Sequence, residues 1–158
     1  DGHAPEQVML YCPEDGLFLA ADQVMERITP NVSIWAMEPN SDALGHYMRS
    51  LKALTTRIPD RTLVLAGHHR PFYGLARRSS EIFAHHEDRC QLILEACRPG
   101  PKSVDELVPV MFRGRTFNAH EMSFAFTETM AHVNRLIRRG ELEWDETTGR
   151  PLCRVTGA

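Results

Sequence analysis

The chain has 158 residues, of which 42% are hydrophobic and 25% are charged, a composition typical of a globular protein. Its length allows one ordinary domain or two small ones. The formal net charge of −3 gives no general attraction to a polyanion. No apolar run approaches the roughly 20 residues that a membrane-spanning helix needs.

The first part of the chain, about residues 1–78, predicts strands, turns and one helix. Val8–Cys12 and Leu17–Ala20 are short apolar runs, and the sequence "PEDG" between them is a strong turn signal. The two runs therefore predict a β-hairpin. Asp22 follows the second strand almost directly.

The segment "VSIW", residues 32–35, is a possible strand. Ser41 is then expected to cap a helix from Asp42 to about Thr56. Its apolar face follows helical spacing and consists of Leu44, Tyr47, Met48, Leu51 and Leu54. Residues 62–66 predict a buried strand, which Gly67 ends in a loop that carries His68 and His69.

Residues 79–158 predict three helices followed by a hairpin. The first helix runs from about Ser80 to Cys97. Capping-box patterns, Ser103 with Glu106 and Asn118 with Glu121, mark the starts of the other two helices.

The third of these helices ends near Gly140, a favourable residue just past a helix. The runs "ELEW" and "PLCRV" then flank the turn "DETTGR" as two short strands. Three helices and a terminal hairpin predict a winged-helix domain. Its expected core includes Phe83, Leu107, Phe124, Ile137 and Trp144.

The four cysteines, Cys12, Cys90, Cys97 and Cys153, form no Cys-x-x-Cys pair, which argues against a cysteine zinc knuckle. Cys90 and Cys97 lie about 10 Å apart along one predicted helix, too far for a disulfide. We expect four reduced, mostly buried thiols in a reducing, cytoplasmic compartment.

Polar residues stand at the ends of predicted strands at three places, where His3, Asp22 and His68 lie next to glycine or small residues. Strand ends meet at one edge of a sheet, so these residues can come together. Two imidazoles and a carboxylate suit Zn²⁺ or Mn²⁺. The plain alternatives are an exposed histidine near the terminus, an aspartate that forms a turn and a solvated histidine pair.

The stretches "DGHAPEQVMLYCPEDGLFLAADQVM" and "TLVLAGHHRPF" resemble the second half of the metallo-β-lactamase-fold hydrolases. The resemblance implies that His3 binds a first metal and His68 a second. It makes Asp22 the carboxylate that bridges both ions and takes part in catalysis. His68 is preferred over His69 because it directly follows Gly67.

The stretches "FAHHEDRCQLILEACRPGPKSVDELVPVMF" and "TMAHVNRLIRRGELEW" resemble the winged-helix segment of one branch of this superfamily, which includes β-lactamase-like hydrolases and endoribonucleases. The implied fold class is α/β, the second half of an αββα sandwich, followed by an α+β winged-helix domain. We place the first in residues 1–78 and the second in residues 79–158.

The family's His-x-His-x-Asp-His loop is absent from this sequence. In the family that loop precedes the first Gly-His motif, so the resemblance implies the C-terminal half of a longer enzyme. We expect the fragment to be inactive alone, with little or no metal bound. It is expected to form homo-oligomers or to associate with the missing N-terminal half.

The resemblance implies that the intact parent is a binuclear hydrolase. It would hold two divalent ions, zinc or else manganese or iron, with a bridging hydroxide that attacks an ester, thioester or phosphodiester. The substrate would be a small molecule or RNA. His69 and Tyr73 are candidates for supporting the metal ligands, and are otherwise ordinary loop residues.

A different hypothesis is a winged-helix module that binds nucleic acid or another partner, with Arg135, Arg138 and Arg139 facing phosphates. However, residues 99–158 hold eight Lys and Arg against eight Asp and Glu, and the predicted wing is acidic. Phosphates would be repelled by such a wing. Basic residues at a helix C-terminus also have a plain explanation in the helix dipole. We therefore do not expect DNA binding.

Overall fold

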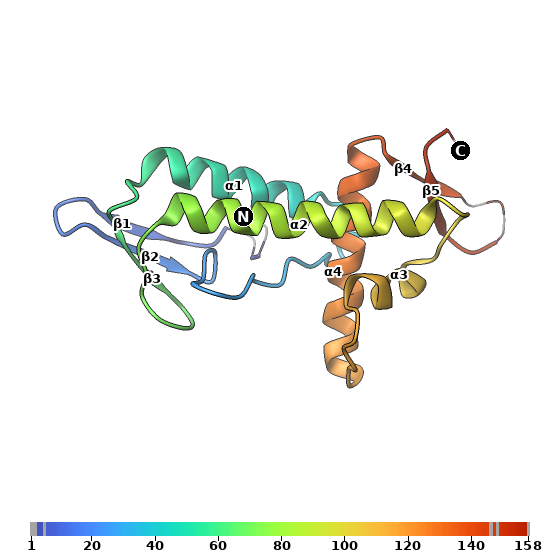
Figure 1. Cartoon of the computed structure of the whole chain (residues 1–158), viewed down its shortest axis with the longest axis horizontal. Helices are drawn as coiled ribbons and strands as arrows, with labels where there is room; N and C mark the ends of the chain where they lie inside the picture. Colours follow the sequence, from blue (N-terminus) through green and yellow to red (C-terminus); the bar gives the residue numbers. More distant parts are fainter. Residues whose placement is uncertain (1–2, 5, 146, 148, 158) are drawn as a thin grey trace. The chain divides into compact units, whose positions relative to one another are not determined.

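A computed structural model describes residues 3–4, 6–145, 147 and 149–157 of this mixed α/β chain (Figure 1). Gly2 of the Gly-His motif, and Glu146 and Thr148 of the predicted turn, lie outside the described residues. The chain divides into two compact units. Unit 1 comprises Asp1–Val32 and Gly45–His85, and unit 2 comprises Ser33–Leu44 and His86–Ala158. Residues 33–44 thus belong with the later unit, although the sequence places them in the first predicted domain.

Unit 1 contains a three-stranded sheet in the order β1-β2-β3. Strands β1 (Leu10–Cys12) and β2 (Leu17–Ala21) pair antiparallel, which confirms the predicted hairpin. Strand β3 (Leu63–Ala66) pairs parallel to β2. Side chains alternate between the two faces of a strand, and the buried face of β2 carries Phe18 and Ala20.

Helix α1 (Ala43–Arg57) and the beginning of α2 (Leu75–Cys97) lie alongside this sheet in Figure 1. The apolar face predicted for α1 is buried at Tyr47, Met48 and Leu51. The Tyr47 hydroxyl donates a hydrogen bond of 3.0 Å to the Gln23 carbonyl. Burial raises the pKa of Tyr47, so this side chain remains a neutral donor at physiological pH.

Helix α2 begins at Leu75, five residues before the predicted start at Ser80. The early start depends on Asp60, whose Oδ1 accepts a 2.8 Å hydrogen bond from the Ala76 backbone N–H. Because this carboxylate caps the helix from a distant part of the sequence, no local pattern signals it.

Arg78 of α2 fixes the chain that follows β2. Its side chain is buried, and its guanidinium donates to the carbonyls of Met25 at 2.7 Å and Ile28 at 2.9 Å. A third bond of 3.1 Å reaches Glu81. A planar group with several donors can satisfy all three acceptors at once.

The possible strand "VSIW" is wrong, since residues 32–35 form no strand. The segment forms hydrogen bonds with helix α4 (Ala119–Arg138) and pairs with no strand. Ile34 donates its backbone N–H to the Thr127 carbonyl at 3.2 Å, and the Thr127 hydroxyl donates to Ser33 Oγ at 2.9 Å. Ile34 is buried by this arrangement.

Both capping boxes predicted for unit 2 are confirmed. The Glu106 carboxylate accepts from the Ser103 N–H at 2.9 Å at the start of α3 (Val104–Met111). Asn118 and Glu121 exchange two bonds, of 2.9 and 3.0 Å, at the start of α4. Gly140 adopts a φ of 73° just after α4, as a residue that ends a helix often does.

Strands β4 (Leu142–Asp145) and β5 (Leu152–Val155) form the predicted terminal hairpin. Among the residues expected in the core, Leu107 is fully buried, whereas Phe83, Ile137 and Trp144 are half-buried. Phe124 was expected inside and is 46% exposed. The reason is that the buried face of α4 begins only at Ala125.

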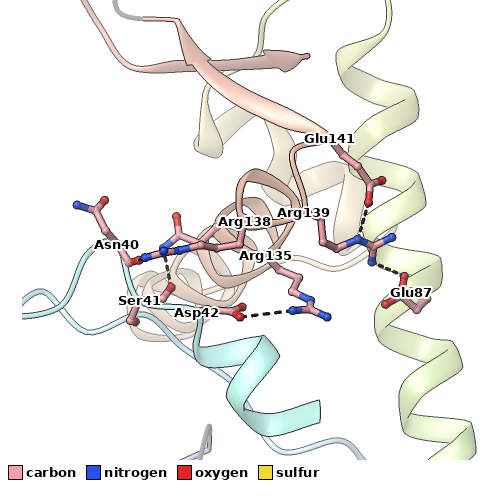
Figure 2. A network of polar contacts seen from close by, with 9 residues as sticks. Asn40, Ser41, Asp42, Glu87, Arg135, Arg138, Arg139 and Glu141 are labelled. Atoms are coloured by element: carbon pink, nitrogen blue, oxygen red, sulfur yellow. Dashed lines mark hydrogen bonds and ion pairs between the residues drawn. The ribbon is translucent and has the colours of Figure 1, made fainter. Parts of the chain in front are cut away.

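Arginines at the end of α4 bind neighbouring parts of unit 2 (Figure 2). Arg135 pairs with Asp42 at 3.4 Å, and Arg138 donates to the Asn40 carbonyl at 3.1 Å. Arg139 pairs with Glu87 at 2.7 Å and also with Glu141. The hydrogen bond to Glu87, with further help from Glu141, raises the pKa of Arg139. These three side chains thus have protein partners where the sequence allowed phosphate partners.

Candidate functional site

The structure brings His3, Asp22 and His68 together in unit 1, although 65 positions of sequence separate the outer two. His3 Nε2 lies 3.7 Å from Asp22 Oδ2, and His68 Nε2 lies 3.6 Å from the same oxygen. The side chains of His3 and Asp22 are 27% and 31% exposed, whereas His68 is 68% exposed. The three tips therefore meet at one solvent-accessible point on the edge of the sheet.

A local irregularity at the end of β2 directs Asp22 to this point. The β2–β3 register shifts between Leu19 and Ala21. Ala21 has a φ of 46°, a left-handed conformation that costs energy for a residue other than glycine. The Gly67 N–H donates to the Ala21 carbonyl at 2.8 Å. This bond holds the ends of β2 and β3 together directly beside Asp22.

Gly67 is required by the position of the Asp22 carboxylate. A Cβ atom at residue 67 would lie 2.4 Å from Asp22 Oδ1, well inside the van der Waals contact distance. The Asp22 carboxylate therefore packs directly against the backbone of residue 67. The site therefore needs a residue without a side chain at position 67. The backbone conformation alone would not require glycine, because the φ of Gly67 is outside the left-handed region.

The ring of His3 is oriented by the Asn31 carbonyl, which lies 2.8 Å from His3 Nδ1. A carbonyl oxygen only accepts hydrogen bonds, so Nδ1 must carry the proton that forms this bond. In the neutral ring Nε2 then holds a lone pair, and this atom faces Asp22. Histidines that bind metals generally show this arrangement, with the other ring nitrogen donating to a carbonyl or carboxylate.

His68 stands on a short loop whose base is closed by the backbone. Val64 and Phe72 exchange two backbone hydrogen bonds, of 2.8 and 3.1 Å. His69 adopts a φ of 68°, which lets the chain turn back directly after His68. His69 and Tyr73 are both exposed, and their predicted supporting role stays a prediction.

The donor atoms fit part of a metal site. Two ligand atoms about 2.1 Å from one zinc ion lie about 3.4 Å apart at a tetrahedral angle, close to the nitrogen–oxygen distances of 3.7 and 3.6 Å found here. Asp22 Oδ1 is buried and has no hydrogen-bond partner in the described part of the chain. In that same part, no group of three or more His, Cys, Asp or Glu residues could by itself hold a metal ion. The site consists instead of two histidine–carboxylate pairs that share one oxygen.

Two contributions to this site escape sequence reasoning. Asn31 acts through its backbone carbonyl, which any residue type would provide. The bulge that aims Asp22 occurs at Ala21, a residue with no turn preference. Only the position of Gly67 at a strand end carried a signal, because a glycine there indicates a close approach of another group.

No helix in the described residues is long and apolar enough to cross a bilayer. No curated protein matches the chain. Residues 90–150 match the family described as "Metallo-beta-lactamase-like, C-terminal domain".

Almost the whole chain is similar in structure to parts of solved proteins. A beta-lactamase domain protein from Burkholderia ambifaria is 38% identical over 98% of this chain, with a TM-score of 0.92. A metallo-beta-lactamase family protein from Thermus thermophilus is 30% identical over 98%, with a TM-score of 0.80. The chain spans 46% of each of these two proteins. Together with the family match, these likenesses support the C-terminal half of a metallo-β-lactamase fold for this chain.

Proposed function

We propose that this chain is the C-terminal half of a binuclear metal-dependent hydrolase that cleaves an ester, thioester or phosphodiester. The observation that carries the proposal is the meeting of His3, Asp22 and His68 around one carboxylate oxygen. The 38% identity to a beta-lactamase domain protein over nearly the whole chain gives it further support.

In this proposal His3 binds one divalent ion, His68 binds the other, and Asp22 is shared between them. Imidazole and carboxylate donors suit zinc, and also manganese or iron. Such ions, when bound, activate water and polarise the bond to be cleaved. The chain's own residues set the geometry: Asn31 fixes the ring of His3, and Gly67 leaves room for the carboxylate.

We propose that unit 2 serves as a winged-helix module that supports the hydrolase and does not bind DNA. The element order supports this proposal, because three helices, α2, α3 and α4, are followed by the β4–β5 hairpin, as expected for a winged helix. In helix-turn-helix proteins the first turns of the last helix contact the bases. Here those turns expose Met122, Phe124 and Phe126, and the arginines further along α4 are paired within unit 2. A small-molecule substrate or single-stranded RNA agrees better with this surface than a duplex does.

We propose that the open face of the unit 1 sheet binds the N-terminal half of the same enzyme, or otherwise a second copy of this chain. An apolar hollow of about 320 Å³ on this face is lined by Val8, Leu10, Leu19, Ala21, Leu65, Ala66 and Gly67. It reaches the residues that flank Asp22, so a partner there would complete the site. The four free thiols support our proposal of a reducing, cytoplasmic compartment.

Zinc binding by the intact parent protein tests the assignment of the ligands. Substituting His3→Ala, Asp22→Asn or His68→Ala should lower zinc affinity by more than about 10-fold, with loss of esterase or phosphodiesterase activity. His46→Ala, an exposed histidine on α1, is the matched control and should change neither. Unchanged affinity and stoichiometry in all three variants would refute the proposed site.

The chain by itself should be nearly metal-free and inactive. It offers each ion one histidine and a share of Asp22, so water must fill the remaining positions and affinity falls. Metal analysis of the purified 18.0 kDa chain, with an ester and a phosphodiester assay, measures this. Two tightly bound zinc ions per chain, with turnover, would show that the half-enzyme proposal is wrong.

A further inference from the structure

A mainly apolar hollow in unit 2 is lined by residues of α3, α4 and the β4–β5 hairpin. Its volume is about 360 Å³, and its lining includes Phe126, Met130 and Trp144 together with the charged residues Asp105 and Arg150. This size is at the lower end of the range for sites that hold small ligands. We propose that the hollow binds an unpaired guanine base of single-stranded RNA.

The apolar part of the hollow carries one aromatic ring from each of two elements. Phe126 of α4 is 41% exposed, and Trp144 of β4 is half-buried. Met122, Phe126 and Met130 recur every four residues, so they share one face of α4. Met122, which is 43% exposed, continues this apolar face toward the start of the helix. Side chains of this kind form a platform on which the flat faces of bases stack.

A carboxylate and a guanidinium supply the polar groups of the hollow. Asp105 Oδ1 lies 3.6 Å from Arg150 Nη2, and the two side chains are 68% and 63% exposed. An ion pair as exposed as this contributes little to stability, so a ligand can take over both groups at small cost. The carboxylate offers two acceptor oxygens, and the guanidinium offers donors that suit a phosphate.

Guanine matches these groups better than the other RNA bases do. It alone has two adjacent N–H donors on its Watson–Crick edge, so it can donate to both oxygens of Asp105. Adenine and cytosine present a ring acceptor on that edge, which the carboxylate would repel. The phosphate of the same nucleotide is then an anion for Arg150. Because this edge is occupied in a duplex, the hollow would select unpaired bases.

The residues of the hollow stand on well-fixed parts of unit 2. Asp105 lies in the first turn of α3, directly after the capping box. Trp144 is paired with Cys153 across the β4–β5 hairpin. The Asp145 carboxylate accepts from the Thr147 N–H at 3.0 Å and so holds the start of the turn that follows β4. Rigid support of this kind lowers the entropy that binding costs.

This inference rests on the proposed function for its biological role, since it selects RNA among the substrates named there. Its test is separate, because binding is measured on the purified full chain with a chelator present and therefore without metal. Failure of the hydrolase assay would leave the binding result unchanged, and failure of binding would leave the metal site unchanged.

Isothermal titration calorimetry compares GMP, AMP and a short oligouridine RNA that contains one central guanine. GMP should bind about 10-fold more tightly than AMP. The RNA should bind more tightly than GMP, because a neighbouring base can stack along the Met122 face of α4. No saturable binding of GMP up to about 1 mM, or equal binding of GMP and AMP, would overturn the proposal. An RNA that binds no more tightly than GMP would overturn the assignment to RNA.

Substitutions locate the ligand in the hollow. Phe126→Ala should weaken GMP binding by about 5-fold or more. Asp105→Asn should abolish the preference for GMP over AMP, because an amide has only one acceptor oxygen. Phe124→Ala and Asp88→Asn are the matched controls, at exposed residues that do not line the hollow, and should change neither property. Wild-type binding in both hollow variants would show that the ligand binds elsewhere.

Tryptophan fluorescence gives a readout that does not depend on the folding of Phe126→Ala. The chain has two tryptophans, and Trp35 is not part of the hollow. In the Trp35→Phe variant all tryptophan emission comes from Trp144, and saturating RNA should quench it by stacking. Unchanged Trp144 emission at saturation would overturn the proposal.

Discussion

At the scale of single residues, the candidate site depends on small geometric features close to Asp22. Its carboxylate faces two histidines with one oxygen and the backbone of Gly67 with the other. Oδ1 could not keep its place if residue 67 carried a side chain. The site is thus set as much by space as by ligands.

Gly67→Ala should displace Asp22 from the two histidines. The new Cβ would lie 2.4 Å from Oδ1, so the carboxylate or the strand ends must move. We expect a loss of about 1–3 kcal/mol in the free energy of unfolding and weaker zinc binding by the intact parent. Gly16→Ala is the control, because residue 16 has a left-handed φ but nothing within 4 Å of the new Cβ. Normal zinc affinity in Gly67→Ala would contradict the steric argument.

Arg78 and its neighbour Arg77 should differ in how much they contribute to stability, because only Arg78 is buried. Arg78→Lys should lower the free energy of unfolding by about 2–4 kcal/mol, because a single ammonium cannot serve two backbone carbonyls and a carboxylate as the planar guanidinium does. Arg77→Lys should cost less than about 0.5 kcal/mol, since Arg77 is largely exposed and pairs with Glu81 only at the surface. Urea denaturation of both variants provides the comparison, and equal costs would argue against it.

At the scale of elements, local signals were accurate where a helix end is completed by its own sequence. The boxes that begin α3 and α4 contain every group that they need within four residues. The start of α2 depends on Asp60 instead, which lies 16 residues before Ala76. A helix start can therefore be predicted from sequence when its capping groups are close neighbours in the chain, and it is missed when the capping group lies far away.

The carboxylate that caps α3 should contribute to acid sensitivity. Hydrogen bonds from Ser103, the backbone N–H first, lower the pKa of Glu106 in the folded chain. A lowered folded pKa gives stability that is present above the unfolded value of about 4.3 and is lost as pH falls through the folded value. Glu106→Gln should therefore reduce the loss of stability on going from pH 6 to pH 3. Glu95→Gln, an exposed residue of α2, is the control. Identical pH profiles for both variants and the wild type would show that the cap contributes nothing.

At the scale of the whole molecule, the sheet of unit 1 leaves one face largely apolar and accessible. Val8 is 76% exposed, Leu10 60% and Leu19 45%. Contiguous apolar surfaces of this kind mark association sites. Whatever covers the face must also approach Ala21 and Gly67, next to Asp22.

The chain should self-associate through this sheet face. Leu10→Glu or Leu19→Glu should shift the sedimentation profile toward monomer at concentrations where the wild type is larger, because a charge would be buried in the contact. Met37→Glu removes an apolar side chain that is 94% exposed on unit 2 and should leave association unchanged. A monomeric wild type across the concentration range would argue against self-association through this face.

Features whose cause is local could be predicted from the amino-acid sequence. The turn "PEDG" and its flanking apolar runs specify the β1–β2 hairpin. The capping boxes specify the starts of α3 and α4. The order of strand ends was enough to bring His3, Asp22 and His68 into one hypothesis, because side chains at strand ends share an edge of the sheet.

Features that depend on partners far along the chain emerged only from the folded structure. Residues 32–35 form no strand, because Ile34 bonds to helix α4 instead. Phe124 is exposed because the buried face of α4 begins after it. Cys153 pairs with Lys102, 51 positions earlier in the chain, only once β5 has folded against the segment before α3. The physical reason is the same in each case. Hydrogen-bond partners and buried contacts can come from anywhere in the chain, whereas a local sequence pattern contains only the partners that neighbouring residues supply.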